Sequence, residues 1–498
     1  MNIPTPLNEP AEPARQEPPP AHKTWKVGTL AYTTGGVVAL FALLLWGDFA
    51  WSMRDRSVMP MAQWYLKNLG VSNVLYALLI SSFPVALGVL LGPVISVKSD
   101  RHRGKWGRRI PFLLVTTPIA AFAMIGLGVT PIIAKWAHGA FGPAHAFGAW
   151  LHGALDDYRA GAWLLVKLQD EVIVSVLCFG VFWALFEIAT IVSQSVFGGL
   201  INDVVPKPLL GRFYGLFRAV SLIDGMIFNY WIMGKVPAHF TLILCSVGVF
   251  YGVAFLWVCL KVKEGDYPPP PEPAGATGTG RRAGWAGGLF GETKRYCKEC
   301  FTNPYYLSVF VLLKLAALSF GPINTFAIPY ARSLGIDMEV YGKYLALTYL
   351  ISLSLSFFIG WLADVAHPLR LAMIALAGYV LVTAWGSVYA TTPNGFLIAW
   401  VAHGVLSGTY MTSAASLGQR LFPHSRFAQF ASAATVFVAF ANMVMAPLMG
   451  LFIDQSGGIF RHTFTVACGL AMLALIAGFY VHAKFMKLGG PRGYVAPE

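Results

Sequence analysis

The sequence predicts an all-α membrane protein with twelve transmembrane helices, arranged as two six-helix halves around a central cavity. Its 498 residues are 56% hydrophobic and only 12% charged, whereas about 25% of residues are charged in a soluble globular domain. The mean hydropathy is +0.61, and the mostly apolar segments reach the ~20 residues that a helix needs to cross a bilayer. A Pro-rich and Gly-rich stretch divides these segments six and six.

The boundaries of the expected helices follow the apolar segments. The twelve spans are 28–53, 71–97, 109–133, 171–200, 212–233, 239–261, 305–330, 340–365, 369–391, 396–419, 427–453 and 463–484. The expected domains are a disordered tail at 1–27, one half at 28–262, a flexible linker at 263–303, a second half at 304–488 and a tail at 489–498. An even helix count places both termini in the cytoplasm, at the plasma (inner) membrane.

A basic loop after the second helix sets the orientation. The stretch SDRHRGKWGRRIPF at 99–112 is rich in Lys and Arg, and short loops of this kind stay cytoplasmic. The net charge of +13 therefore reflects topology and not nucleic-acid binding. GWLADVAHPLR at 360–370 repeats the pattern of Asp, short turn and Arg in the second half. We expect a gating role for Asp100, Arg101, Gly107, Arg108, Arg109, Asp364 and Arg370.

Several charged side chains fall inside apolar helices, where they are costly and usually functional. Glu187 shares one helical face with Trp183, Thr190 and Gln194. An indole beside a carboxylate and an amide suits a polyhydroxylated ligand. The expected substrate-binding residues are Trp183, Glu187, Gln194, Asp224, Lys314 and Asn324, and the expected proton-coupling residues are Asp48, Glu187 and Asp224.

Each of these assignments has a structural alternative. Trp183, Glu187 and Gln194 would also serve helix-to-helix contacts with no ligand. Lys314 suits a salt bridge to Glu187 or Asp224 as well as contact with substrate. His403 is interpreted as a packing residue more readily than as a titrating one. Arg218 lies near a helix end, where it can reach the membrane surface.

Candidate metal-ligating residues are few. His138, His145 and His152 recur every seven residues in the far-side loop 134–170, but Gly142 and Pro143 interrupt a helix there. We interpret this loop as an interfacial lid in preference to a metal site. Cys297 and Cys300 form a CxxC without a second pair. We therefore expect no metal and no cofactor.

The basic loop carries a family resemblance. SDRHRGKWGRRIPF resembles the corresponding loop of the major facilitator superfamily, and more narrowly that of the sucrose/proton symporters and the glycoside-pentoside-hexuronide cation symporters. WGDF at 46–49 and CFTNPYY at 300–306 are similar to the latter group. The resemblance implies a twelve-helix transporter that works by alternating access. At the positions where melibiose-type symporters place two sodium-binding carboxylates, this sequence has Gly88 and Gly92. Protons are therefore the expected coupling ion.

Together these observations predict a secondary active transporter that couples protons to the symport of a sugar or glycoside. The alternatives are an exporter of hydrophobic compounds and a non-transporting membrane assembly or receptor protein. An enzyme is not expected, since no nucleophile, metal or phosphate-binding motif is recognisable. The expected partners are a small-molecule substrate, protons and membrane lipid, with no nucleic acid, and the expected state is a monomer.

Overall fold

The computed structural model describes residues 24–266, 303–415, 417–422 and 427–497 of the chain. The side chains of 97, 357, 363–364, 419, 427–437 and 492 also lie outside the description. The predicted N-terminal tail up to residue 23 and the predicted linker over 267–302 fall outside the described residues.

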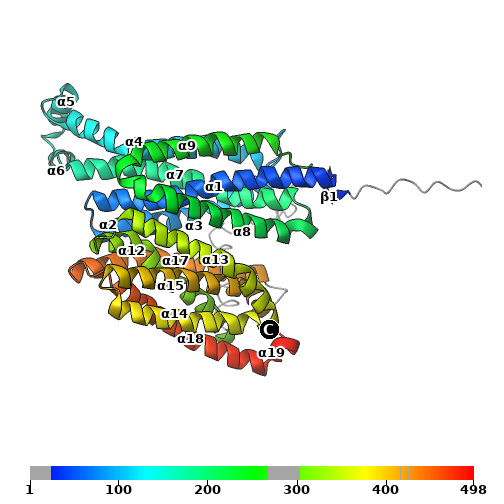
Figure 1. Cartoon of the computed structure of the whole chain (residues 1–498). Helices are drawn as coiled ribbons and strands as arrows, with labels where there is room; N and C mark the ends of the chain where they lie inside the picture. The colour runs from blue at the N-terminus through cyan, green and yellow to red at the C-terminus, as the bar shows by residue number, and fades with distance from the viewer. Residues whose placement is uncertain (1–23, 267–302, 416, 423–426, 498) are drawn as a thin grey trace, which may run out of the picture.

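The first half follows a short antiparallel hairpin of β1 (Trp25–Val27) and β2 (Leu30–Tyr32), in which Lys26 pairs with Ala31. Long helices then alternate in direction (Figure 1). They are α1 (Thr34–Asn68), α2 (Asn73–Ala77) continued by η1 (Leu78–Ser82) and α3 (Phe83–Arg101), α4 (Ile110–Phe141), α7 (Glu171–Val204), α8 (Leu210–Ile227) continued by η3 (Phe228–Ile232) and η4 (Met233–Lys235), and α9 (Val236–Lys261). Short helices α5 (Ala146–Leu155), α6 (Arg159–Leu168) and η2 (Lys207–Leu209) connect them.

The second half repeats this layout, with no hairpin among its described residues. Its helices are α11 (Pro304–Phe310) continued by η5 (Val311–Leu315) and α12 (Ala316–Ser333), α13 (Met338–Ala366), α14 (Pro368–Tyr389), α15 (Pro393–Ala414), α16 (Leu417–Leu421), α17 (Phe427–Gln455), α18 (His462–Lys487) and α19 (Gly490–Gly493). Each of the twelve predicted spans overlaps one of the long helices or continuous helical runs. The start of the first span differs: α1 begins at Thr34 and not at residue 28, because the hairpin of β1 and β2 occupies 25–32, which includes the end of the tail predicted to be disordered up to residue 27.

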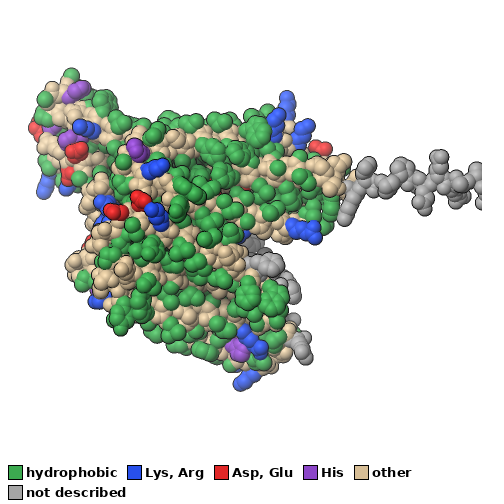
Figure 2. Space-filling model, in the orientation of Figure 1, with side chains coloured by type: hydrophobic (Ala, Val, Ile, Leu, Met, Phe, Trp, Pro, Cys, Tyr) green, Lys and Arg blue, Asp and Glu red, His purple; other side chains and the backbone are tan. Residues whose placement is uncertain are grey.

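The composition of these helices suits a membrane. Within the described residues, 9 helical stretches are long and apolar enough to span a bilayer, and one of them, Lys207–Lys261, contains both α8 and α9. Figure 2 shows hydrophobic side chains over the sides of both halves and most charged side chains toward the ends. The chain is therefore a multi-pass membrane protein.

The first helix is longer than predicted. The prediction ended it at residue 53 because Arg54, Asp55 and Arg56 interrupt the apolar run, yet α1 continues to Asn68. Arg54 is fully buried, forms an ion pair with Asp55 at 2.7 Å and lies 3.9 Å from the Trp51 ring centroid. Neutralisation by Asp55 and contact with an aromatic face allow the guanidinium to remain inside the helix bundle. The three charged residues consequently lie within one continuous helix and not in a loop.

The two halves are joined at the predicted far side. The Asp454 carboxylate accepts hydrogen bonds from Asn73 Nδ2 at 2.6 Å and from the backbone N of Asn73 and Val74 at 3.3 Å. It therefore satisfies N–H groups at the start of α2, which have no partner within the helix. Tyr76 donates to the Thr325 carbonyl at 2.7 Å, and Ser82 donates to the Met443 carbonyl at 2.6 Å. These bonds close that end of the molecule.

The helices α5 and α6 project beyond α4 and α7 at the same end (Figure 1). They contain most of the predicted interfacial lid, which remains a prediction. His138 Nε2 lies 2.9 Å from the carbonyl oxygen of Gln169, so this histidine ties α4 to the start of α7. Among the described residues, no cluster of three or more His, Cys, Asp or Glu side chains could hold a metal ion.

Candidate functional site

A cavity of about 610 Å³ lies between the two halves. Both halves contribute to its wall, the first through α1 and α8 and the second through α12, α13, α15 and α17. The residues that line it are Arg56, Arg218, Leu222, Ala317, Phe320, Gly321, Asn324, Tyr341, Leu345, Thr348, Tyr349, Ser352, Trp400, Gly404, Ser407, Gly408, Met411 and Asn442.

Arg56 enters this cavity from α1 and is held by two hydroxyl groups. Its Nη1 donates to Tyr349 Oη at 2.9 Å, and its Nη2 donates to Ser221 Oγ at 3.2 Å. The guanidinium carbon also lies 4.8 Å from the Tyr349 ring centroid. A guanidinium has five N–H donors, so Arg56 keeps several donors for a further partner.

Arg218 enters the cavity from α8 as an exposed side chain. Within the described part of the chain, no Asp or Glu oxygen lies within 4.0 Å of the Arg56 or Arg218 guanidinium. The described lining of the cavity also contains no Asp or Glu. The wall of the central cavity is therefore positively charged.

Asn324 is oriented by a buried hydrogen-bonded chain. His403 Nε2 lies 3.1 Å from Asn324 Oδ1, and His403 Nδ1 lies 2.9 Å from Tyr379 Oη. If Nε2 carries the proton, His403 donates to the Asn324 carbonyl and accepts from the Tyr379 hydroxyl. The Asn324 amide N–H groups are then available to a ligand in the cavity.

The basic loop between α3 and α4 forms an ion-pair network with the end of α7. Arg108 makes two bonds to Asp203, at 2.9 and 2.5 Å. Arg109 contacts Asp203 at 3.2 Å, Asp100 at 2.5 Å and Ser99 Oγ at 2.6 Å. Bidentate arginine–carboxylate pairs are strong and geometrically specific. This network holds the turn between α3 and α4 against the C-terminal end of α7, within the first half.

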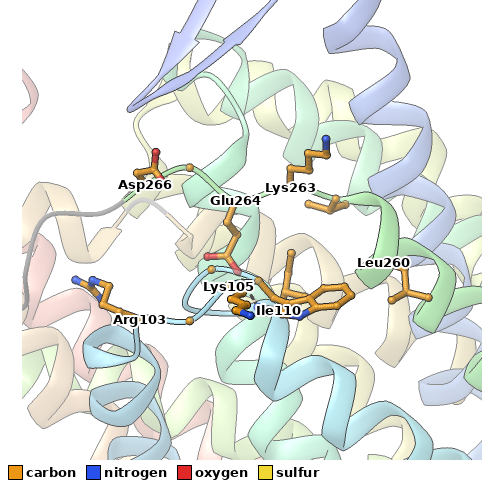
Figure 3. A pocket seen from close by; sticks show the side chains of 12 residues that line it. Arg103, Lys105, Ile110, Leu260, Lys263, Glu264 and Asp266 are labelled. Carbon is orange, nitrogen blue, oxygen red and sulfur yellow. Dashed lines mark hydrogen bonds between the residues drawn. The ribbon is translucent and has the colours of Figure 1, made fainter.

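Glu264 holds the same turn from the other side. Its carboxylate accepts hydrogen bonds from the backbone N of Arg108, Arg109 and Ile110 at 3.0, 2.8 and 2.7 Å. Figure 3 shows the Glu264 side chain pointing from the segment after α9 toward the start of α4, beside a hollow of about 1150 Å³. A carboxylate satisfies the free N–H groups of a helix start and is favoured by the helix dipole.

Two six-helix halves with a cavity between them identify the fold. It is the fold of the Major Facilitator Superfamily. The superfamily's family model matches residues 309–493. The bacterial homologue of the human lysosomal transporter Spinster, in its inward-facing and occupied conformation, has a TM-score of 0.59 at 15% identity, over 93% of this chain and 98% of that chain. The D-xylose–proton symporter has a TM-score of 0.55 at 13% identity, over 89% and 96%.

The chain also resembles a sucrose transporter over a limited stretch. Sucrose transport protein SUT1 of Oryza sativa subsp. japonica is 28% identical over 141 residues. The stretch covers 27% of this chain and 25% of the rice protein. This match is consistent with the resemblance expected from the basic loop.

In this major facilitator fold the predicted carboxylates lie behind the cavity wall and not on it. Asp48 and Asp224 are 0% exposed and Glu187 is 5% exposed. Ser52 Oγ donates to Asp48 at 3.5 Å. Both Asp224 carboxylate oxygens are buried with no hydrogen-bond partner among the described residues. The structure thus places all three in the interior of the first half.

The other predicted substrate-binding residues are dispersed. The Trp183 indole is fully buried, donates to the Leu79 carbonyl at 2.8 Å and stacks on Phe179. Gln194 is exposed further along α7, and Lys314 is half-buried in η5. Among the described residues, Lys314 has no carboxylate within 4.0 Å. Of the predicted set, Asn324 lines the cavity.

The second gating loop is described only in part. Arg370 is exposed, with Nη2 3.9 Å from Met486 Sδ, and the Asp364 side chain lies outside the described residues. Between them, His367 has a positive φ of 74°, and its Nδ1 accepts from the backbone N of Leu369 at 3.3 Å to begin α14. In the first loop, Gly107 has the positive φ, 94°, which glycine adopts without steric cost. Arg101 is exposed at the end of α3.

The sequence analysis did not predict the residues that make the cavity wall positive, Arg56 and Arg218, or the residue that caps the start of α4, Glu264. Arg56 was assigned to a loop, and Arg218 was assigned to the membrane surface. A signal for Arg56 was present, because an apolar segment resumes immediately after it, at SVMPMAQWYL over 57–66. Glu264 carries no comparable signal, since only the fold brings it to the start of α4.

Proposed function

We propose that this protein is a secondary active transporter that couples protons to the symport of a sugar or glycoside by alternating access. The observation that carries the proposal is the cavity of about 610 Å³ shared by the two halves, beneath an end that inter-half hydrogen bonds close. Rocking of one half against the other would expose such a cavity to alternate sides. The protein would act as a monomer in the plasma (inner) membrane with both termini in the cytoplasm.

Polar and aromatic groups in the cavity wall suit a sugar. Asn324, Ser352 and Asn442 offer hydrogen-bonding groups, while Tyr341 and Trp400 offer aromatic surface. A sugar presents hydroxyl groups beside apolar CH groups, so it uses both kinds of contact. The similarity to a rice sucrose transport protein and to the fold of a D-xylose–proton symporter supports this substrate class. Two arginines in the wall disfavour an exporter of hydrophobic compounds.

The buried carboxylates are candidates for the proton carrier. Asp224 has no cation within 4.0 Å and no hydrogen-bond donor among the described residues, and a buried charged carboxylate without a direct partner is costly. The protonated form avoids that cost, and access of water in another conformation would release the proton. Asp48 and Glu187 are further candidates. Gly88 and Gly92 provide no side-chain oxygen for sodium.

The network of Asp100, Asp203, Arg108 and Arg109 would then serve gating. It ties the turn between α3 and α4 to the end of α7, so these helix ends move together. Asp364 and Arg370 would take the corresponding part in the second half.

Uptake by reconstituted proteoliposomes tests the proposal. We expect sugar accumulation driven by an inward proton gradient, abolished by a protonophore and unchanged when choline replaces sodium. Asp224→Asn and Glu187→Gln fix the neutral form and should abolish accumulation while leaving exchange of substrate across the membrane intact. Ser356→Ala, on α13, is a matched control. Sodium-stimulated uptake that survives the protonophore would contradict proton coupling.

A further inference from the structure

A hollow of about 1150 Å³ lies outside the central cavity, at the end of the first half that is predicted to be cytoplasmic. It is bounded by the turn between α3 and α4 and by the segment that follows α9 (Figure 3). Its charged lining residues in the described part of the chain are Arg103, Lys105, Lys263, Glu264 and Asp266. Its large apolar lining residues are Trp106, Ile110, Leu260 and Val262. The proposed transport cycle does not use this hollow.

Positive charge is available around the hollow. Lys105 and Lys263 are exposed, and no Asp or Glu oxygen among the described residues lies within 4.0 Å of either ammonium group. The Glu264 carboxylate, by contrast, is bonded to three backbone N–H groups at the start of α4. Figure 3 shows Arg103 and Lys263 on opposite sides of the hollow, with Lys105 between them. The hollow therefore offers cations to a ligand, while one of its two carboxylates already has partners.

The turn that carries Lys105 and Trp106 is held in one arrangement. Gly107 N donates to the Gly104 carbonyl at 3.0 Å and closes the turn. Gly107 also leaves room for the Glu264 side chain, since a Cβ at this position would lie 2.6 Å from Glu264 Cβ. A fixed turn presents its exposed lysine and indole to a ligand with little ordering cost.

The apolar wall of the hollow continues into an exposed face of α9. Val253, Trp257 and Leu260 follow one another at helical spacing and are 68%, 49% and 51% exposed. In a multi-pass membrane protein, such an exposed apolar stripe is a contact surface for lipid. Trp106, which lines the hollow together with Leu260, is 52% exposed, and indole side chains are typical of the membrane–water interface. The hollow thus lies where a lipid-facing stripe meets a cationic turn.

We infer that this hollow binds an anionic phospholipid, with its phosphate beside Lys105 and Lys263 and its acyl chains along the exposed face of α9. A soluble anion would leave Trp106 and Leu260 exposed, and a lipid without net charge would leave the lysines without a counter-charge. Figure 2 shows Lys and Arg side chains gathered at this end of the first half, and such clusters beside membrane helices attract anionic headgroups. The site is separate from the central cavity, so the inference holds whatever the protein transports.

Thermal unfolding of the delipidated full-length protein in a nonionic detergent tests the ligand class. The probes are dioctanoyl phosphatidylglycerol, dioctanoyl phosphatidylcholine, glycerol 1-phosphate and inorganic phosphate. We expect phosphatidylglycerol to raise the melting temperature, because a ligand that binds the folded state stabilises it, and to bind about fivefold more tightly than phosphatidylcholine. The two soluble anions should have no effect at the same concentration. An equal effect of the two lipids, or a full effect of either soluble anion, would overturn the inference.

Variants locate the binding site. Lys105→Gln combined with Lys263→Gln should weaken the binding of phosphatidylglycerol by about tenfold. The matched control combines Lys207→Gln with Lys261→Gln, which removes two exposed cations from the same end of the first half but outside the lining of the hollow. This control should weaken the binding far less. Equal weakening in the two double variants would assign the effect to general surface charge and overturn the inference.

Fluorescence quenching gives a second measurement that does not need the lysine variants to fold. In nanodiscs, phosphatidylglycerol with brominated acyl chains should quench the tryptophan emission of the unmodified protein more than that of Trp106→Phe. The difference between the two proteins should be smaller with brominated phosphatidylcholine at the same mole fraction. An equal difference with both lipids would show that the hollow does not select an anionic headgroup, which also overturns the inference.

Discussion

Arg56 and Tyr349 join the two halves of the molecule beside the central cavity. Arg56 Nη1 donates to Tyr349 Oη at 2.9 Å, and the guanidinium carbon lies 4.8 Å from the Tyr349 ring centroid. The first residue comes from α1 and the second from α13, so rocking of the halves must alter this contact. A ligand held by Arg56 would therefore act directly on the boundary between the halves.

The first prediction concerns this contact. Tyr349→Phe keeps the ring and removes the hydroxyl acceptor, which should weaken the association of the halves in this conformation by about 1 to 2 kcal/mol. Distance distributions between spin labels on α1 and α13 should broaden or shift. Tyr344→Phe, an exposed position on α13, is the control. An unaltered distribution in Tyr349→Phe would show that the bond does not hold the halves.

The second prediction ranks the two carboxylates that bind the arginines of the first gating loop, Asp203 at the end of α7 and Asp100 at the end of α3. Asp203 is 12% exposed and binds both Arg108 and Arg109, whereas Asp100 is 55% exposed and binds Arg109. Asp203→Asn should lower the free energy of unfolding by about 1.5 to 3 kcal/mol, and Asp100→Asn by about 0.2 to 1 kcal/mol. Chemical denaturation in detergent would measure both.

The same variants test gating. Asp100→Asn and Asp364→Asn should each slow transport while leaving substrate binding largely intact, because the conformations shift but the cavity does not change. Transport at the wild-type rate in both variants would exclude the gating role of these two residues.

The third prediction concerns the start of α4. Glu264→Ala removes the acceptor of three backbone N–H groups and should cost about 0.5 to 2 kcal/mol, as the loss of a helix cap does. Hydrogen exchange at residues 108–110 should accelerate. Asp266→Ala removes a carboxylate two residues later and should not affect those amides. Equal exchange in both variants would remove the capping role of Glu264.

The fourth prediction is a pH dependence at the turn between α13 and α14. Burial, together with the positive charges of Arg420 and Arg370 and the neighbouring His482, lowers the pKa of His367 from its ordinary value. The unfolded chain then binds more protons than the folded one. Stability should therefore be complete above about pH 6.5 and fall as the pH drops from there through the folded-state pKa.

His367→Asn provides the test, because Asn tolerates the positive φ and can also cap α14. Its melting temperature should vary less between about pH 7 and pH 5 than that of the unmodified protein, in line with removal of one titrating group. The control is His462→Asn. His462 is the first residue of α18, whereas His367 packs against Phe485 near the last turn of that helix, so this variant should keep the original pH profile. The opposite ranking of the two variants would show that His367 does not control the pH response.

The sequence by itself determined the twelve helices, their division into two halves and the basic loop that carries the family resemblance. These features depend on local composition, since an apolar run of sufficient length forms a membrane helix wherever its neighbours lie. For the same reason the carboxylates Asp48, Glu187 and Asp224 were recognised at membrane depth. Asn324 was predicted to bind substrate; the structure puts it on the cavity wall, and its role in binding stays a prediction.

Only the tertiary structure decided which polar residues share a site. Arg56 reaches the cavity because Asp55 and Trp51 accommodate Arg54 and allow α1 to continue to Asn68. Trp183, whose helical face was predicted to bind substrate, instead donates to Leu79 across a helix contact. Glu264 meets Ile110 across 154 residues of sequence. Such contacts depend on how separate helices are rotated and how closely they approach one another. The hydropathy of each segment along the chain does not determine the rotation or the approach.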